Sequence, residues 1–421
     1  MAQRAKRRRL NTQSNPTSLA EETRKLYSND PLSPATHLEK DKWNGFCEIE
    51  SEPALFNVML REFGVKGVKV QEVVSLDDEM LAVLHKPVYG LIFLFRWRED
   101  DPEKQEAICP EGIWFANQTA NNACASVALL NIVNNIEGID LGENLRLFKE
   151  FTMPFTPALR GDAINNFEFV KNIHNSFARK MDMLNADLHL RNETTFSKAK
   201  PSKNNYNDSD VDAGFHFIAF VPALGKLWKF DGLERQPQAR GDCSPDDWLN
   251  LAKPDILTRM AEYEEDQIEF SVLGLVRDPM DAYIQELAVN IRCLQLVNRL
   301  LAATSRDDTA TAFSTSLLEN ILLGPDALYG LTEEMVNITS VPTEEEKQYK
   351  VYSSEELAAQ QVKLCEHQKE LRASIREEQQ SYQADEDYAT GRRFDYGPAI
   401  RTWVRFLAQK TAIEDLALLD D

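Results

Sequence analysis

Four residues in this chain of 421 have the types and surroundings that nucleophilic catalysis requires: a cysteine, a histidine, an aspartate and a glutamine. Cys124 lies where a polar turn, QTANNA, becomes the apolar run ASVALLNIV. Unpaired N–H groups and the positive end of a helix dipole at such a junction favour a thiolate. A structural cysteine would sit equally well further inside the apolar run, so we predict that Cys124 is reactive.

A thiolate nucleophile also needs a base, a group that orients the base, and donors for the oxyanion. His216 lies in the predicted strand FHFIAFVP, and Asp231 ends the strand KLWKF that follows a short turn. A hairpin of these strands would let Asp231 bind one imidazole nitrogen while the other faces Cys124. Gln118 precedes the cysteine on the entry turn and is placed to aim its amide at the oxyanion.

Each of these residues also has an ordinary structural explanation. A cysteine at a helix start is more often inert, a strand histidine is more often a core or surface residue, and Asp-Gly after a strand is usually a turn. The combination favours a site, because four roles occur in one chain order on a frame of helix and strands. The other histidines have no acidic partner across a predicted hairpin; they are at positions 37, 85, 174, 189 and 367.

Apolar patterns predict the elements that must position these residues. PVYGLIFLFRW, 87–97, has the pattern of a strand that is buried on both faces. Residues 140–180 are expected to be helical, a further helix is expected near 245–263, and IEFSVLGLV is expected to form the last strand. The polar residues 181–213 show almost no periodicity, which predicts a long loop.

Composition limits the class of protein. A net charge of −21 argues against nucleic-acid binding by the bulk of the molecule and suits a basic partner. The six scattered cysteines favour reduced thiols, and neither a metal nor a cofactor is predicted. Without a secretory signal or an apolar run of about 20 residues, we expect a soluble intracellular protein that does not bind membranes.

The N-terminal residues 1–40 are polar and rich in proline, and we expect a disordered basic tail. Its run RAKRRR, 4–9, is either a nuclear import signal or a solvated basic segment. With the import signal, the expected location is the nucleus as well as the cytoplasm.

Beyond Pro279 the sequence predicts a helical extension, 280–421. One seam indicates a helix pair or coiled coil, or equally a helix packed back on the catalytic domain; it consists of Ile284, Leu287, Ile291 and Leu294. In 343–387 leucines repeat every seven residues, but polar residues such as Gln361 and Gln368 interrupt the seam, so we expect a solvated helix. An amphipathic element at about 388–410 is expected to dock on a partner.

Three segments carry a resemblance to a known family. FANQTANNACASVALLNIV resembles the cysteine box of the ubiquitin carboxyl-terminal hydrolases, FHFIAFVPALGKLWKFDGL resembles their histidine and aspartate box, and ESEPALFNVMLREFGVKGVKVQEV is similar to their amino-terminal signature. The resemblance implies a papain-like α+β fold over 41–279, with a cysteine helix on a largely antiparallel sheet. It also implies a thiol hydrolase that cleaves at the carboxyl-terminal glycine of ubiquitin in conjugates, with Gln118, Cys124, His216 and Asp231 at the family's catalytic positions.

Further expectations rest on the resemblance alone. The stretch 181–213 would be the loop that crosses over the active site and limits the size of the leaving group. Substrate contacts would lie near Glu48 and Phe270. KNIHNSFAR, DDWL and RRFDYGPAIRTWVRFL resemble the long members of the family, whose extra helical domain docks on the proteasome or on a chromatin-bound partner. The alternative is a ubiquitin-binding scaffold with little turnover, in which the tail is the working part.

Overall fold

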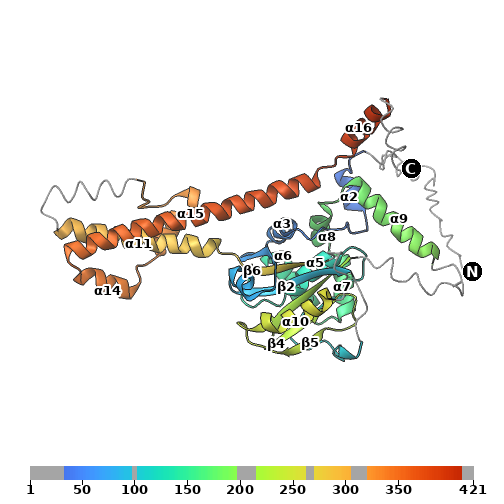
Figure 1. Ribbon diagram of the computed structural model, residues 1–421, viewed down its shortest axis with the longest axis horizontal. Coiled ribbons are helices and arrows are strands. Elements are labelled where there is room, and N and C mark those ends of the chain that lie inside the picture. The colour runs from blue at the N-terminus through green and yellow to red at the C-terminus, as the bar shows by residue number, and fades with distance from the viewer. Residues whose placement is uncertain (1–32, 97–101, 197–214, 262–269, 305–319, 410–421) are drawn as a thin grey trace, which may run out of the picture.

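An antiparallel sheet of six strands forms the centre of the molecule (Figure 1). The computed structural model describes residues 33–96, 102–196, 215–261, 270–304 and 320–409. The strands have the order β1-β6-β2-β3-β4-β5 across the sheet, and every neighbouring pair is antiparallel. In chain order they are β1 (Val68–Glu72), β2 (Val88–Arg96), β3 (Phe215–Ala223), β4 (Lys226–Phe230), β5 (Gln238–Asp242) and β6 (Phe270–Arg277).

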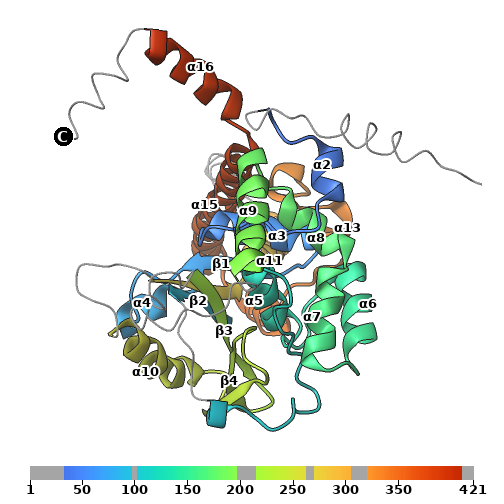
Figure 2. The same cartoon turned by 90° about the vertical axis from the view of Figure 1, so that its right-hand side faces the viewer.

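Helices cover both faces of this sheet (Figure 2). The apolar run predicted as a buried strand forms β2, which is central and packs side chains into a core on each face. One face packs against α3 (Pro53–Phe63), α5 (Cys124–Val133), α6 (Gly142–Thr152) and α8 (Glu168–Asn175). The other face packs against α4 (Asp78–Val83) and α10 (Trp248–Met260). The predicted α+β fold, with a cysteine helix on an antiparallel sheet, is confirmed.

Two predictions for the segments that flank this core are wrong. Residues 37–42 form α2 (His37–Lys42) instead of belonging to a disordered tail, because Thr36 and Glu39 make a reciprocal capping box. Residues 180–196 form α9 (Lys180–Phe196) instead of a loop. The carboxylate of Asp182 accepts the N–H of Arg179 at 3.0 Å, and leucine, methionine and alanine in the stretch favour a helix. The basic run 4–9 and residues 197–213 lie outside the described residues.

A pair of long helices extends from the sheet as an arm (Figure 1). α11 (Met280–Thr304) runs outward and α15 (Ser354–Arg393) returns antiparallel to it. The apolar seam predicted from Ile284 to Leu294 packs against α15, so it belongs to a helix pair and not to a helix packed on the catalytic domain. The arm also contains η2 (Ala327–Tyr329), α13 (Glu333–Ile338) and α14 (Thr343–Val351), and α16 (Gly397–Gln409) follows it. The sheet and the helices that cover it form the body of the molecule, which also contains η1 (Pro102–Lys104) and α7 (Pro157–Asn165). None of the helices in the described ranges has both the length and the apolarity to cross a bilayer.

The prediction that 343–387 forms a solvated helix is wrong. The leucines of its seam are buried, and so are the two glutamines that interrupt it. Gln368 donates to Asn290 of α11 at 3.2 Å and exchanges two hydrogen bonds with the backbone of Leu322. Gln361 donates to Asn298 of α11 at 2.7 Å. Amide pairs therefore satisfy the polar seam positions, and these positions fix the register of α11 against α15.

The C-terminal half of α15 lies on the body instead of the arm. Arg61 of α3 pairs with Asp385 at 3.1 Å, and the buried Lys69 of β1 pairs with Glu378 at 2.6 Å. Arg392 donates to both oxygens of Glu50 and to Asp182 at the start of α9. The end of α15 thus connects α3, the segment before α3 and α9.

The amide pairs of the arm yield a prediction about stability. Gln368→Ala should lower the free energy of unfolding by about 2 kcal/mol, because it removes the hydrogen bonds that Gln368 makes to Oδ1 of Asn290 and to the N–H of Leu322. Urea unfolding of the whole chain measures this difference. The control is Gln379→Ala, whose amide donates to the Leu328 carbonyl at an exposed site and whose loss should cost less than about 0.5 kcal/mol. Equal stabilities of the two variants would contradict the assigned role of Gln368.

Candidate active site

Cys124 is the first residue of α5, as predicted, and it is partly exposed while every later residue of that helix is buried. The turn before it is fixed by Asn122, whose φ of 61° lies in the left-handed region and whose amide donates to the Phe46 carbonyl at 3.3 Å. Asparagine tolerates this backbone conformation better than most residues. The polar turn noted in the sequence therefore delivers the thiol to the surface end of a buried helix.

His216 and Asp231 come together on the β3–β4 hairpin. The Nε2 atom of His216 lies 2.7 Å from Oδ1 of Asp231, and both side chains are buried. Asp231 also accepts the N–H of Leu233 at 2.9 Å. Since Nε2 faces the carboxylate, Nδ1 remains for Cys124. The side chains of His216 and Cys124 are hydrogen-bonded to each other. The predicted order of contacts, from aspartate to histidine to cysteine, is present.

The charges in this cluster shift the pKa of His216 upward. Burial acts to lower the pKa, but hydrogen bonds to Asp231 and Cys124 outweigh burial and raise it to about 9. Burial acts to raise the pKa of Asp231, but the hydrogen bond and charge of His216, the charge of Lys229 and the N–H of Leu233 together outweigh burial and lower the pKa. The geometry thus favours an imidazolium between two acceptors.

Gln118 lies beside this cluster because its backbone is bonded to the residue that follows Asp231. The N–H of Gln118 donates to the carbonyl of Gly232 at 2.8 Å. A Cβ atom at Gly232 would lie 3.1 Å from Cβ of Gln118, so glycine permits this close approach. The Oε1 atom of Gln118 is buried and has no hydrogen-bond partner. The structure therefore brings the four residues predicted from the sequence close together.

Asn131 of α5 and Asn135, which lies two residues beyond the end of that helix, hold the segment that leads to Gln118. Asn131 accepts the N–H of Ala116 at 2.8 Å and donates to its carbonyl at 3.2 Å. Asn135, one turn later, makes the same two bonds to Trp114, at 2.9 and 2.7 Å. Their carboxamides pair with alternate residues of the segment as a neighbouring strand would.

Arg160 of α7 holds the other edge of the same segment. Its guanidinium is buried and donates to the carbonyls of Ile113 and Phe115, both at 3.1 Å. Sequence reasoning missed Arg160 and the two asparagines. A signal for Asn131 was available, since a polar residue within an otherwise apolar helix must find a partner when it is buried.

His174 has no role in this cluster, although it lies behind α5. Its Nε2 atom lies 2.7 Å from the carbonyl oxygen of Cys47, and its Nδ1 atom lies 2.8 Å from Oγ of Ser126. Burial lowers its pKa to about 4, against the hydrogen bond to Cys47. A carbonyl can only accept, so Nε2 carries the proton and the ring is neutral.

The two residues expected to contact substrate occupy different positions. Phe270 pairs with Phe95 of β2, and Phe95 pairs in turn with His216 of β3. Phe270 therefore lies in the same row across the sheet as the histidine. Glu48 is exposed in the segment before α3, and its carbonyl accepts a bond from Arg392 at 3.4 Å. Among the residues that the structure describes, no three His, Cys, Asp or Glu side chains are grouped to hold a metal ion, and all six cysteines are unpaired.

Comparison with known proteins identifies the family. The family model described as ubiquitin carboxyl-terminal hydrolase, family 1, matches residues 46–261, about half of the chain. This chain belongs to that family. The resemblance in its cysteine and histidine segments is therefore confirmed.

Two curated members of the ubiquitin carboxyl-terminal hydrolases are similar to the same region. Ubiquitin carboxyl-terminal hydrolase isozyme L5 of Dictyostelium discoideum is 41% identical over 234 residues, which are 56% of this chain and 62% of that protein. Ubiquitin carboxyl-terminal hydrolase ubh-4 of Caenorhabditis elegans is 36% identical over 249 residues, which are 58% of this chain and 71% of that protein. The match thus spans less than two thirds of the first relative's length.

A solved structure of a family member is also similar. Trichinella spiralis UCH37 bound to ubiquitin vinyl methyl ester is 30% identical, with a TM-score of 0.45 over 57% of this chain and 86% of that one.

The contacts of His216 predict its titration. The His216 ring should keep its second proton up to a pH of about 9, and Asp231→Asn should lower its pKa because the carboxylate no longer favours the charged ring. NMR of the imidazole Cε1–H signals measures both values. His174 is an internal control, since its ring should stay neutral throughout. Because the folded pKa is raised, the stabilisation by this proton is complete below about pH 6.5 and is lost as the pH rises through about 9. Titration of His216 near its ordinary value in the native chain would contradict the assigned contacts.

Proposed function

We propose that this chain is a cysteine-type ubiquitinyl hydrolase that cleaves bonds at the carboxyl-terminal glycine of ubiquitin in conjugates. The observation that carries the proposal is His216, held at 2.7 Å by Asp231 and hydrogen-bonded to Cys124 at the N-terminus of α5. Membership of the hydrolase family supports the same conclusion. No cofactor is needed, because the thiol, the imidazole and the donors supply the whole reaction.

The residues divide the reaction between them. The Sγ atom of Cys124 attacks the carbonyl carbon of the ubiquitin glycine, while the imidazolium of His216 gives its proton to the leaving amine. Asp231 keeps Nδ1 directed at the thiol and stabilises the charged ring. Gln118 supplies an amide donor to the oxyanion, together with the N–H of Cys124. His216 then removes a proton from the water that hydrolyses the thioester.

The surroundings suit ubiquitin as the substrate. Its flexible end carries arginines before two glycines, and the acidic chain, with a net charge of −21, attracts that basic segment. We place the ubiquitin contacts near Phe270, in the row of the catalytic histidine, and near Glu48. We assign the crossover over the active site to 181–213, whose first part is the helix α9. Asp182 of α9 accepts a hydrogen bond from Arg392 of α15. Arg392 also bonds the segment that contains Glu48.

A covalent probe tests the activity against the alternative of a scaffold. Incubation with ubiquitin that carries a carboxyl-terminal electrophile should yield one adduct, because only Cys124 is both partly exposed and bonded to His216. Cys124→Ala should abolish the adduct and turnover but retain ubiquitin binding. The control is Cys243→Ala, a partly exposed thiol whose pKa burial raises, and it should react as the native chain does. Ubiquitin binding without an adduct, even with a partner protein present, would favour the scaffold.

The oxyanion assignment predicts two graded losses of turnover. Gln118→Ala should lower kcat by roughly 10² or more, the usual effect of losing one such donor. Gly232→Ala should lower kcat about tenfold with little change in KM, because its methyl group would displace Gln118. Steady-state hydrolysis of a small ubiquitin conjugate measures both constants. Gly391→Ala, at a helical glycine with open space around it, is the control. Native kcat in Gln118→Ala would refute the assignment.

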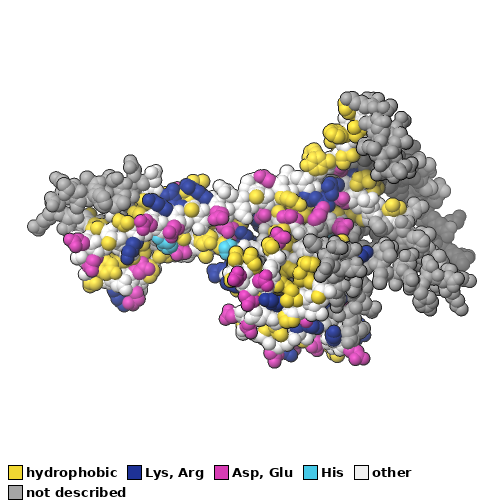
Figure 3. Space-filling view, viewed as in Figure 1, with side chains coloured by type: hydrophobic (Ala, Val, Ile, Leu, Met, Phe, Trp, Pro, Cys, Tyr) yellow, Lys and Arg dark blue, Asp and Glu magenta, His cyan; other side chains and the backbone are white. Residues whose placement is uncertain are grey.

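The C-terminal helix α16 is the proposed docking element for a proteasome-associated or chromatin-associated partner. Its Trp403 is 70% exposed and Ile400 is 56% exposed, and apolar side chains gather over this helix in Figure 3. Exposed apolar surface of this kind marks interaction sites. The docking element begins later than the predicted position 388, because residues up to Arg393 belong to α15 and bind the body. The basic run 4–9 supports a nuclear as well as a cytoplasmic location.

This division changes the experiment on the tail. The double variant Ile400→Ala/Trp403→Ala should lose partners that the native chain recovers from a cell extract, yet hydrolyse a small ubiquitin conjugate at the native rate. Deleting 388–421 should also reduce hydrolysis, because it removes the contacts of Arg392 with Glu50 and Asp182. Leu257→Ala on α10 is an exposed apolar control elsewhere on the molecule. Full recovery of all partners by the double variant would exclude this docking role.

A further inference from the structure

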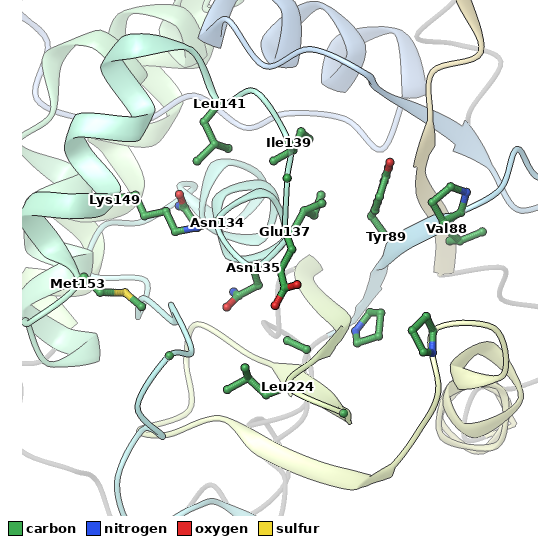
Figure 4. A pocket seen from close by; sticks show the side chains of 18 of the residues that line it. Val88, Tyr89, Asn134, Asn135, Glu137, Ile139, Leu141, Lys149, Met153 and Leu224 are labelled. Atoms are coloured by element: carbon green, nitrogen blue, oxygen red, sulfur yellow. The ribbon is translucent and has the colours of Figure 1, made fainter. Parts of the chain in front are cut away.

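A cavity of about 850 Å³ lies at the opposite end of α5 from Cys124. It is bounded by the end of α5, by α6, by the start of β2 and by the β3–β4 turn (Figure 4). Ten residues along a helix correspond to about 15 Å, so the cavity is separate from the catalytic cluster. Its volume is within the usual range of small-molecule sites, roughly 300–1,000 Å³.

The walls of the cavity are mainly apolar. Figure 4 shows Tyr89 and Val88 of β2 on one side, Met153 on the opposite side and Leu224 of the β3–β4 turn below them. Tyr89 and Met153 are partly buried, and both pack against the main core. A ligand that fills this space would therefore bury apolar surface against an aromatic ring and aliphatic side chains.

The charged groups around the cavity are balanced. Arg146 pairs with Glu150 one turn along α6, at 2.9 Å. Burial lowers the pKa of Lys149, and the nearby carboxylate of Glu137 opposes that shift. A charged ligand would have to compete with these carboxylates and cations, so the walls favour a neutral one.

Asn134 is a buried polar residue of the cavity wall whose side-chain amide has no hydrogen-bond partner. Its side chain lines the cavity and is 2% exposed, and neither Nδ2 nor Oδ1 has a hydrogen-bond partner. The neighbouring Asn135, by contrast, bonds both to Trp114 and to the Asn131 carbonyl. A buried amide without hydrogen-bond partners is energetically unfavourable, and a ligand that pairs with it can remove this cost.

We propose that this cavity binds a neutral, largely apolar small molecule with a lactam or carboxamide edge. Such an edge presents an N–H donor and a carbonyl acceptor side by side, which is the complement of the Oδ1 and Nδ2 atoms of Asn134. The ring or chain behind that edge occupies the apolar space between Tyr89, Leu224 and Met153. The paired charges of α6 remain undisturbed at the rim.

A matched pair of probes tests the site on the whole chain. 2-Quinolone has a lactam edge on an apolar bicycle, and N-methyl-2-quinolone has the same body without the donor. By protein-observed NMR, 2-quinolone should shift signals of Asn134, Tyr89 and Leu224 and should bind at least tenfold more tightly than the N-methyl compound. Neither probe should shift the signals of His216.

Two variants complete the experiment. Asn134→Leu should reduce the preference for 2-quinolone to about unity, and it should retain the thermal stability of the native chain because it removes unpaired buried groups. Ala223→Trp, on a different wall, should reduce binding of both probes by filling the space. Equal affinities of the native chain for both probes, retention of the preference in Asn134→Leu, or no binding of either probe would overturn the proposal.

Discussion

The hydrogen bonds that Asn131 of α5 and Asn135, just beyond that helix, make to residues 114–116 are the constraint on which the cluster around Cys124 depends. α5 is buried beyond its first residue, so any polar group on it must be satisfied by a neighbouring part of the chain. Asn131 meets this requirement by bonding to the backbone that leads to Gln118, and Asn135 continues the same pairing beyond the end of the helix. The same helix that presents Cys124 therefore fixes the position of the amide beside it.

Burial determines how this constraint acts on the charges. His216, Asp231 and Lys229 are all nearly inaccessible, and Lys229 is paired with Glu234 at 3.0 Å. In such surroundings a change of charge on one side chain strongly shifts the pKa values of its partners, because water does not screen their interaction. His174, equally buried behind α5, has neutral partners only and stays neutral. The contrast between the two histidines comes from one carboxylate and one thiol.

The sequence was sufficient for the parts of the site that depend on local pattern. Cys124 is marked by the change from polar turn to apolar helix, and His216 and Asp231 are marked by two adjacent strands joined by a short turn. Arg160 could not be predicted, because its role comes from carbonyls of a segment 45 to 47 residues away in the chain. The burial of the α15 seam could not be predicted for the same reason. Gln361 and Gln368 are polar, and the sequence does not show that asparagines of α11 are their hydrogen-bond partners. α9 was missed because its N-terminal capping depends on one carboxylate, Asp182, within a polar stretch.

The return of α15 to the body has a consequence for the order of events during synthesis. Arg61 and Lys69 emerge from the ribosome early, yet their partners Asp385 and Glu378 lie more than 300 residues later. Contacts of such long sequence separation form late, because the intervening chain must first be made and its loop entropy lost. Until then the face of α3 and β1 that α15 covers is exposed to solvent. Lys69, which is buried in the complete fold, is then hydrated, and its apolar neighbours are exposed. A nascent chain that still lacks α15 (Ser354–Arg393) therefore carries an incomplete surface, and the packing of this helix completes the body.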